Sequence, residues 1–320
     1  MSRVLVLILA CLGLLPRAGI TQDYPAREIR SLCNFSAGSG ADIIVRFYSD
    51  RLSKLAARPV IVENKVGANG ALATDALAKS RPDGYTILIT PASSTIASAP
   101  YLFKNLPFDA EKDFTAVTTI ASLSFVIMVD GAKPLKSIDD LIAQLKSKPN
   151  NGFYGSTSNT GVISAELFKT KVGLNTVYVP YKQNVQALTD LLLGQLDFLT
   201  FDATWAAVQA KGGKVRILAA TAAKRSVALP DVPTLTELGY GGNDVSPWWG
   251  VVVAAGTPTP IVAKLADWFN QITAAEDTKK FLADSAFDPF PGSPAQMQAL
   301  LKSDAVRWKR YIEMAKIEPQ

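Results

Sequence analysis

The sequence predicts a two-lobed α/β fold with a ligand cleft between the lobes. Two observations lead to this prediction: short apolar segments alternate with helical patterns in two separate series, and extended segments join the two series. Such alternation is typical of parallel α/β units. At 320 residues and 48% apolar content, the chain is long enough to form two domains of ordinary size. We expect residues 24–124 and 247–320 to form one lobe and residues 125–246 to form the other.

The first series starts with the strand-like segment EIRSLCNF, followed by a helical pattern from Asp42. In this pattern Ile44, Tyr48 and Leu52 recur every four residues, which places them on one helix face. The strand-like segments PVIVEN and YTILIT follow, with a helical pattern at residues 72–79 between them. The loop after the first strand therefore leads directly into a helix N-terminus.

The second series follows two extended segments within residues 114–130 and a helix whose Ser137 and Asp140 have capping-box spacing. Its strand-like segments are GFYGSTSNTG, NTVYVPY, LDFLTFD and VRILAAT, with helices expected near 162–172 and 187–193 and a short helix before the last strand. A Pro- and Gly-rich stretch then predicts a linker back to the first lobe. The strand GVVVAA and three amphipathic helices after Pro258 end the chain.

The N-terminal segment has the features of a secretory signal peptide. Arg3 precedes an apolar run from Val4 to Leu15, which is shorter than the roughly 20 residues that a membrane span needs. We expect residues 1–21 to be removed on export, with a mature start near Gln22. This predicts a periplasmic protein without a membrane anchor.

The composition excludes several kinds of chemistry. The chain has no histidine, which removes serine–histidine and cysteine–histidine catalytic pairs and imidazole-bound zinc. Only Cys33 remains after signal cleavage, so neither an internal disulfide nor a cysteine-based metal site can form. The net charge of +5 falls to about +3 once Arg3 and Arg17 leave with the signal, and no basic block indicates nucleic acid. We therefore expect no catalytic residues, metal or cofactor.

The loop CNFSAGSGAD is the first candidate ligand site. Backbone N–H groups between a strand and a helix N-terminus, together with the helix dipole, can hold a carboxylate or another small anion. A plain tight turn is the alternative interpretation for such a loop taken alone. The candidate ligand-binding residues here are Phe35, Ser36, Ala37, Gly38, Ser39, Gly40, Ala41 and Asp42.

A dinucleotide site is the main alternative for this loop. Gly38 and Gly40 match the first two glycines of G-x-G-x-x-G, and Glu63 lies at about the distance expected of a ribose-binding acid. Ile43 occupies the position of the third glycine, where a side chain opposes close packing of helix and strand. No Walker A motif exists in the chain, so the sequence favours a general anion site over a nucleotide-binding enzyme.

Three further loops follow predicted strands and precede helices. Because strand ends meet at the crevice of an open parallel sheet, we expect these loops to lie at the cleft. Their hydroxyl groups and amides also suit ordinary caps and turns, and an N-cap is the default role of the single aspartate among them. The candidates are Ser93, Ser94 and Thr95 in the first loop, Ser156, Thr157, Ser158, Asn159, Thr160, Gly161 and Ser164 in the second, and Asp202 in the third.

Taken together, these motifs resemble the tripartite tricarboxylate transporter solute receptors, also called Bug receptors. The similarity spans nearly the whole mature chain and depends on the joint order of NFSAGSGAD, VIVENKVGANG, RPDGYTILI, VPYKQ, QALTDLLLGQLDFLTFD and AAKRSVALPDVPTLTELGY. The resemblance implies a periplasmic binding protein fold of the Venus flytrap type that closes on a small carboxylate, often a di- or tricarboxylate. It also implies delivery of that ligand to a two-component membrane permease, with no chemistry on the ligand.

By position, the resemblance assigns the carboxylate to the stretches Phe35–Asp42 and Ser156–Ser164. The chain departs from the family pattern at both. Ser36 and Ala37 replace the usual prolines, and Ala41 replaces a common threonine. The family's frequent Ser-Thr-Ser-His run falls on Asn159, Thr160, Gly161 and Val162. We expect a monomeric receptor that binds a carboxylate through Asn159, Thr160 and backbone amides, and Lys182 in VPYKQ could add a positive charge. A receptor of the same fold that serves a sensory partner is the remaining alternative.

Overall fold

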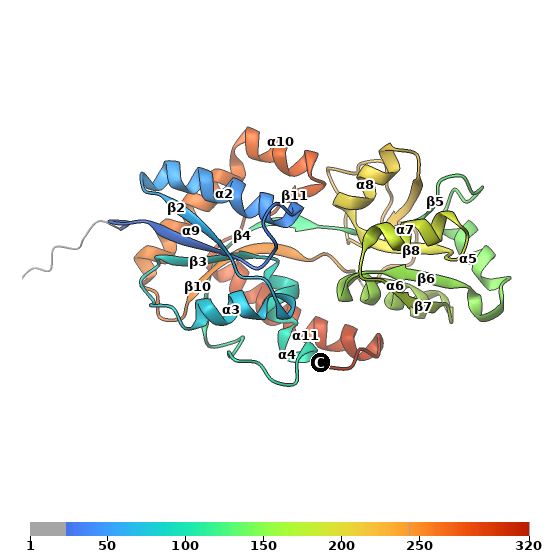
Figure 1. Cartoon of the computed structure of the whole chain (residues 1–320), viewed down its shortest axis with the longest axis horizontal. Helices are drawn as coiled ribbons and strands as arrows, with labels where there is room; N and C mark the ends of the chain where they lie inside the picture. The colour runs from blue at the N-terminus through green and yellow to red at the C-terminus, as the bar shows by residue number, and fades with distance from the viewer. Residues whose placement is uncertain (1–23, 243, 320) are drawn as a thin grey trace, which may run out of the picture.

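A computed structural model describes residues 24–242 and 244–319 and consists of two lobes side by side (Figure 1). Lobe 1 is built on a six-stranded sheet in the order β11-β4-β10-β3-β1-β2, and lobe 2 on a five-stranded sheet in the order β7-β6-β8-β5-β9. The expected signal peptide, residues 1–21, lies outside the described residues. The strands of lobe 1 are β1 (Ile29–Cys33), β2 (Val60–Asn64), β3 (Thr86–Thr90), β4 (Phe114–Leu123), β10 (Trp248–Ala254) and β11 (Phe287–Pro289).

Both faces of the lobe 1 sheet are covered by helices, which is why a central strand such as β3 reads as a continuous buried run. Tyr48 and Phe269 belong to the core under the helices of one face, and Leu77 and Trp308 to the core of the other. The first face carries α2 (Gly40–Ala56), α9 (Thr259–Ala274) and α10 (Glu276–Asp284). The second carries η1 (Ala68–Gly70), α3 (Ala71–Ala78), η2 (Ser93–Ala97), α4 (Ala99–Leu102) and α11 (Pro294–Met314).

Lobe 2 repeats this plan, with one core on each face of its sheet. The capping box at Ser137 and Asp140 is confirmed at the start of α5. The strands are β5 (Phe125–Asp130), β6 (Phe153–Ser156), β7 (Val177–Pro180), β8 (Phe198–Asp202) and β9 (Val215–Ala220). The helices are α5 (Ile138–Lys146), η3 (Pro149–Asn151), α6 (Asn159–Val172), α7 (Asn184–Leu192) and α8 (Ala203–Lys211).

The sequence placed the start of α6 three residues too late, near Val162. The helix begins at Asn159 because Ser158 caps it, with the Ser158 side chain accepting a hydrogen bond from the backbone N–H of Gly161. The residues Asn159 to Gly161, expected in a loop, therefore form the first turn of the helix.

Two crossing segments join the lobes, one between β4 and β5 and one before β10. On the lobe 1 side the backbone N–H of Leu123 donates to the carbonyl of Pro247 (2.9 Å). On the lobe 2 side the Thr221 hydroxyl lies within hydrogen-bond distance of the carbonyls of both Phe125 (3.1 Å) and Val245 (2.8 Å). The two crossings are thus held next to each other at both ends.

The start of α6 lies very close to the sheet of lobe 2. A Cβ atom on Gly161 would lie 2.1 Å from Ser156 Oγ and 2.6 Å from the carbonyl oxygen of Thr200. The Gly161→Ala variant should therefore lose about 1–3 kcal/mol of unfolding free energy in urea titrations, because the helix must move away from the sheet. Gly40, in the first turn of α2, faces open space, and Gly40→Ala should leave stability unchanged or slightly raised. Equal effects of the two substitutions would contradict the proposed close approach.

Candidate functional site

A cavity of about 900 Å³ lies between the lobes and is lined by residues of both. Its walls come mostly from segments that follow the carboxyl ends of β1, β2, β3, β6 and β7, where open α/β sheets place their ligands. Lobe 1 contributes Asn34, Phe35, Val66, Gly67, Ala68, Asn69, Gly70, Pro91, Ser94, Thr95, Ser98, Leu102 and Trp308. Lobe 2 contributes Thr157, Ser158, Asn159, Thr160, Ile163 and Lys182.

The first predicted loop is organised around the buried carboxylate of Asp42. This group accepts hydrogen bonds from the backbone N–H of Gly38 (2.8 Å), from Arg46 Nε (2.7 Å) and from Asn64 Nδ2 (2.7 Å). The Ser39 side chain caps α2 by accepting from the Asp42 N–H. The Asp42 carboxylate is therefore occupied within the loop itself.

These bonds outweigh the effect of burial on the acidity of Asp42. Burial alone would raise the pKa of this carboxyl, but the hydrogen bonds from Arg46, Asn64 and Gly38 lower the pKa to about 2. The carboxylate is thus ionised at neutral pH and holds the turn between β1 and α2.

Of the first loop, Phe35 reaches the cavity wall. Its ring stacks on Trp249 with ring centroids 5.4 Å apart. The residues that follow Phe35 do not line the cavity, and several of them are exposed at the surface. These residues are Ser36, Ala37, Gly38, Ser39, Gly40, Ala41 and Asp42.

The second predicted loop contributes four consecutive residues to the cavity wall, Thr157 to Thr160. Thr157 donates its hydroxyl hydrogen to Asn184 Oδ1 (2.7 Å), and Ser158 caps α6. The side chains of Asn159 and Thr160, both half-buried, have no hydrogen-bond partner among the described residues. These two side chains are therefore available to a ligand.

Three other predicted residues near this loop lie behind the wall. Ser156 Oγ donates to the carbonyl of Thr200 (2.9 Å), and Ser164 Oγ donates to the carbonyl of Thr160 (2.9 Å). Gly161 permits the close packing of α6 on the sheet. These three residues set the position of α6 and do not line the cavity.

The candidate residues in the loop after β3 also fall into two groups, one that lines the cavity and one that lies behind its wall. Ser94 and Thr95 line the cavity, whereas Ser93 is buried behind them. Ser93 Oγ donates to Asp304 Oδ2 (2.7 Å) and accepts from Trp308 Nε1 (3.1 Å). Asp304 Oδ2 also accepts from Trp248 Nε1 (2.7 Å). This buried network holds the Trp308 indole at the cavity wall.

Asp202 is a helix N-cap, which is the default role that the sequence indicated. It is the N-cap of α8 and accepts a hydrogen bond from the backbone N–H of Trp205 (2.9 Å). Burial raises the pKa of Asp202 above its usual range, although the backbone N–H groups act in the opposite direction. Asp202 does not line the cavity.

Several wall residues were not among the sequence candidates. Asn34 directly follows β1, and the turn Gly67–Gly70 follows β2, so the same strand-end rule could have found both. Gly67 and Gly70 have φ values of +140° and +94°, which favour glycine and allow this turn. Leu102, Ile163 and Trp308 gave no local signal, because they reach the wall through the packing of distant helices.

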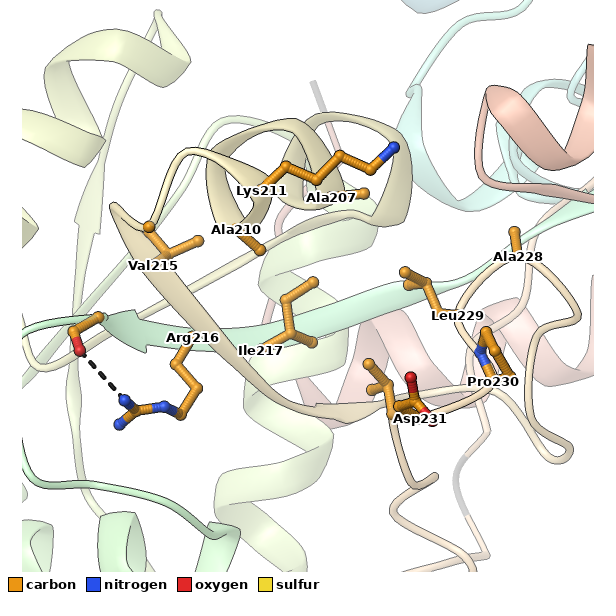
Figure 2. A pocket seen from close by; sticks show the side chains of 13 residues that line it. Ala207, Ala210, Lys211, Val215, Arg216, Ile217, Ala228, Leu229, Pro230 and Asp231 are labelled. Carbon is orange, nitrogen blue, oxygen red and sulfur yellow. Dashed lines mark hydrogen bonds between the residues drawn. The ribbon is translucent and has the colours of Figure 1, made fainter.

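A second hollow of about 560 Å³ lies on lobe 2, between α8, β9 and the segment 228–232 (Figure 2). Figure 2 shows Ile217 and Leu229 among the residues that line this hollow, with the Arg216 side chain on the other side of β9 from Ile217. The Arg216 guanidinium donates to the carbonyls of Lys133, Leu135 and Gly131. This hollow contains none of the predicted site residues, and residues from lobe 2 alone line it.

Within the described part of the chain, no three or more Cys, Asp or Glu side chains gather in a way that could hold a metal ion. Among the same residues, no helix has both the length and the apolar character that a bilayer span requires.

Comparison with known sequences identifies relatives along the whole chain. Residues 44–317 match the sequence profile described as the tripartite tricarboxylate transporter family receptor. A UPF0065 protein of Bordetella bronchiseptica is 32% identical over 320 residues, which cover 100% of this chain and 95% of that protein. Protein BugT of Bordetella pertussis is 30% identical over 309 residues, which cover 94% and 95% of the two chains.

Solved structures are similar over nearly the full length. An R. palustris protein with adipate is 31% identical at a TM-score of 0.80, covering 93% of this chain and 100% of the other. The periplasmic binding protein BugD is 28% identical at a TM-score of 0.76, and the alignment covers 93% of this chain and 100% of BugD. MatC from Rhodopseudomonas palustris, with bound malate, is 26% identical at a TM-score of 0.74, and the alignment covers 90% of this chain and 100% of MatC. These similarities confirm the predicted two-lobed periplasmic binding protein fold.

The low pKa of Asp42 predicts a stability contribution that disappears in acid. Because the pKa falls from 3.8 to about 2 on folding, the contribution is present above about pH 4 and is lost as the pH falls towards 2. We expect Asp42→Asn to cost about 1–3 kcal/mol of unfolding free energy at pH 7. The difference from the wild type should shrink between pH 4 and pH 2.

Urea unfolding at several pH values measures this difference. Arg46→Gln is the matched variant: it keeps the bonds from Asn64 and Gly38 and removes one half-exposed cation, so its cost should be smaller. A cost of Asp42→Asn that stays constant from pH 7 to pH 2 would show that the carboxylate charge does not stabilise the loop.

Proposed function

The chain belongs to the tripartite tricarboxylate transporter receptor family of solute-binding proteins, and we propose that its own ligand is a small organic carboxylate bound in the cavity between the lobes. After binding, the closed receptor delivers this ligand to a two-component membrane permease. Export to the periplasm by the N-terminal signal segment is part of the same proposal. Two similar solved structures hold adipate and malate, which supports a carboxylate as the ligand class.

The observation that carries the proposal is the charge and donor content of the cavity wall. Among the described residues that line it, Lys182 is the one charged residue, and no carboxylate faces the space. Asn159 and Thr160 add side-chain donors at the N-terminus of α6. A wall with these groups attracts an anion and contains no negative charge that would repel it.

Ligand binding would shift the equilibrium between an open and a closed form of the receptor. A ligand that contacts both walls favours the closed form, since its interactions with both lobes exist only there. The two crossing segments, held together by Thr221 and by the bond between Leu123 and Pro247, are the proposed hinge. On this proposal, lobe 1 comprises residues 24–124 and 247–320, and lobe 2 comprises residues 125–246.

The first loop supports a receptor over a nucleotide-binding enzyme. In the alternative interpretation as a dinucleotide fingerprint, the backbone N–H of Gly38 would face a phosphate, but it donates to Asp42 instead. The glycines of this loop also lie outside the cavity wall. We therefore propose that the chain binds its ligand without transforming it.

A thermal-shift screen of the mature protein against aliphatic, hydroxy and aromatic carboxylates tests the ligand class. A carboxylate that binds the folded form should raise the midpoint of unfolding, with a stabilisation of about 2.7 kcal/mol at a concentration 100 times its dissociation constant. NAD should give no shift. Stabilisation by NAD and by none of the acids would reverse the proposal.

Calorimetry on the best acid then tests the role of Lys182. Because this lysine is exposed, Lys182→Met should weaken binding by roughly twofold to fivefold, and the loss should fall at high salt. Lys211→Met is the matched control, since Lys211 lines the separate hollow on the same lobe and should leave affinity unchanged. Equal losses for the two variants would show that the effect comes from the overall charge of lobe 2.

A further inference from the structure

Two buried polar side chains in the lobe 1 wall have hydrogen-bonding capacity that the protein does not use. Asn34 is 7% exposed and Thr95 is 6% exposed, and both line the cavity. The side-chain oxygen Oδ1 of Asn34 accepts a hydrogen bond from the Thr90 hydroxyl (3.1 Å). Among the described residues, neither the Asn34 Nδ2 group nor the Thr95 hydroxyl has a partner. Neither group is among the polar atoms of the described residues that are both unpaired and inaccessible to solvent, so both are open to the cavity and a ligand atom can replace water there.

The two side chains lie next to each other above Gly70. A Cβ atom on Gly70 would lie 2.9 Å from Asn34 Nδ2 and 2.8 Å from Thr95 Cγ2. The absence of a side chain at Gly70 therefore makes room for both groups. The Thr95 atom nearest Gly70 is its methyl group, so the two side chains flank Gly70 on one part of the wall, which we call the Asn34–Thr95 cluster and which is assembled from the segments that follow β1, β2 and β3.

Near this cluster, two serine hydroxyls and the Trp308 indole direct their hydrogens into the protein. Ser94 Oγ donates to the carbonyl of Pro91 (3.3 Å), and Ser98 Oγ donates to the carbonyl of Ser94 (2.7 Å). The Trp308 Nε1–H donates to Ser93, so the indole presents apolar surface. The Trp308 indole, Leu102 and Ile163 give the wall an apolar stretch beside the cluster.

The charge of the cavity is confined to lobe 2. Lys182 lies there with Asn159 and Thr160, whereas the described wall residues of lobe 1 carry no formal charge. A carboxylate is therefore better placed against lobe 2. A second carboxylate on the Asn34–Thr95 cluster would lose water without gaining a countercharge, whereas an uncharged group would lose less.

We infer that Asn34 and Thr95 form a second recognition subsite for an uncharged hydrogen-bonding group at the end of the ligand opposite its carboxylate. The preferred ligand is then a monocarboxylate with an apolar middle section and a terminal amide, carbonyl or hydroxyl group. This inference rests on the proposed function, because it takes the carboxylate at the lobe 2 end as given.

Matched sets of acids test the inference by calorimetry. The six-carbon set is hexanoate, adipamate (the monoamide of adipic acid) and adipate, and the four-carbon set is butyrate, succinamate and succinate. At the length that binds, the monoamide should bind at least fivefold more tightly than the monoacid, which has no polar far end. It should also bind at least fivefold more tightly than the diacid, which has a second charge.

Variants at Thr95 and at a threonine outside the cavity wall locate the effect. Thr95→Val removes the unused hydroxyl and should remove most of the monoamide's advantage over the monoacid, while the affinity for the monoacid stays within twofold. Thr95→Ser should restore the advantage. Thr189→Val is the matched control, because Thr189 is exposed on α7, does not line the cavity and donates its hydroxyl to the carbonyl of Val185, and it should change both affinities by less than twofold. Circular dichroism checks that each variant is folded.

The outcomes separate the two proposals. A diacid that binds as tightly as the monoamide, or a monoamide that binds no better than the monoacid, would overturn the subsite. An equal loss for monoamide and monoacid in Thr95→Val would overturn the role of its hydroxyl. Failure of all six acids to bind the wild type, in a protein shown to be folded, would instead count against the proposed carboxylate function.

Discussion

The cavity depends on how the chain passes between the lobes. Only two described segments link them covalently, and they run next to each other. The Thr221 hydroxyl approaches the carbonyls of both segments, so they share an anchor in lobe 2. Two paired segments permit bending about their common position and oppose sliding of one lobe past the other. On the proposed function, this lets the walls of the cavity approach and separate while each keeps its own arrangement.

Each wall is arranged by polar groups that point away from the cavity. The buried carboxylate of Asp42 holds the turn after β1, and the bond from Ser156 to Thr200 lies behind the start of α6. Asp304 joins Ser93 to Trp248 and so supports Trp308 from behind. Satisfied buried groups of this kind fix the positions of their neighbours. The groups left without partners among the described residues, such as Asn34 Nδ2 and the Asn159 side chain, then stand out as the ones a ligand can use.

The alternation of strands and helices, the two lobes and the general position of the site could be predicted from local sequence signals. The loop before α6 was expected at the cleft because it follows a strand, and four of its residues line the cavity. The first loop shows the limit of this rule. A glycine-rich sequence before a helix does not reveal that Asp42, Arg46 and Asn64 will bond to one another, since Asn64 lies on another strand. Trp308 could not be predicted at all, because it contacts Ser93 across 215 positions of sequence.

The strand order of lobe 1 has a consequence for how the protein is made. β10 lies between β3 and β4 in the sheet, yet it follows the whole of lobe 2 in the chain. While the chain emerges from its N-terminus, β3 and β4 must wait for residues 248–254 before the sheet can close, and their edges stay open to other strands. The sheet of lobe 2 is formed by one continuous stretch and can assemble during that interval. Vectorial synthesis therefore favours maturation of the inserted lobe first, and the lobe that starts the chain is completed last.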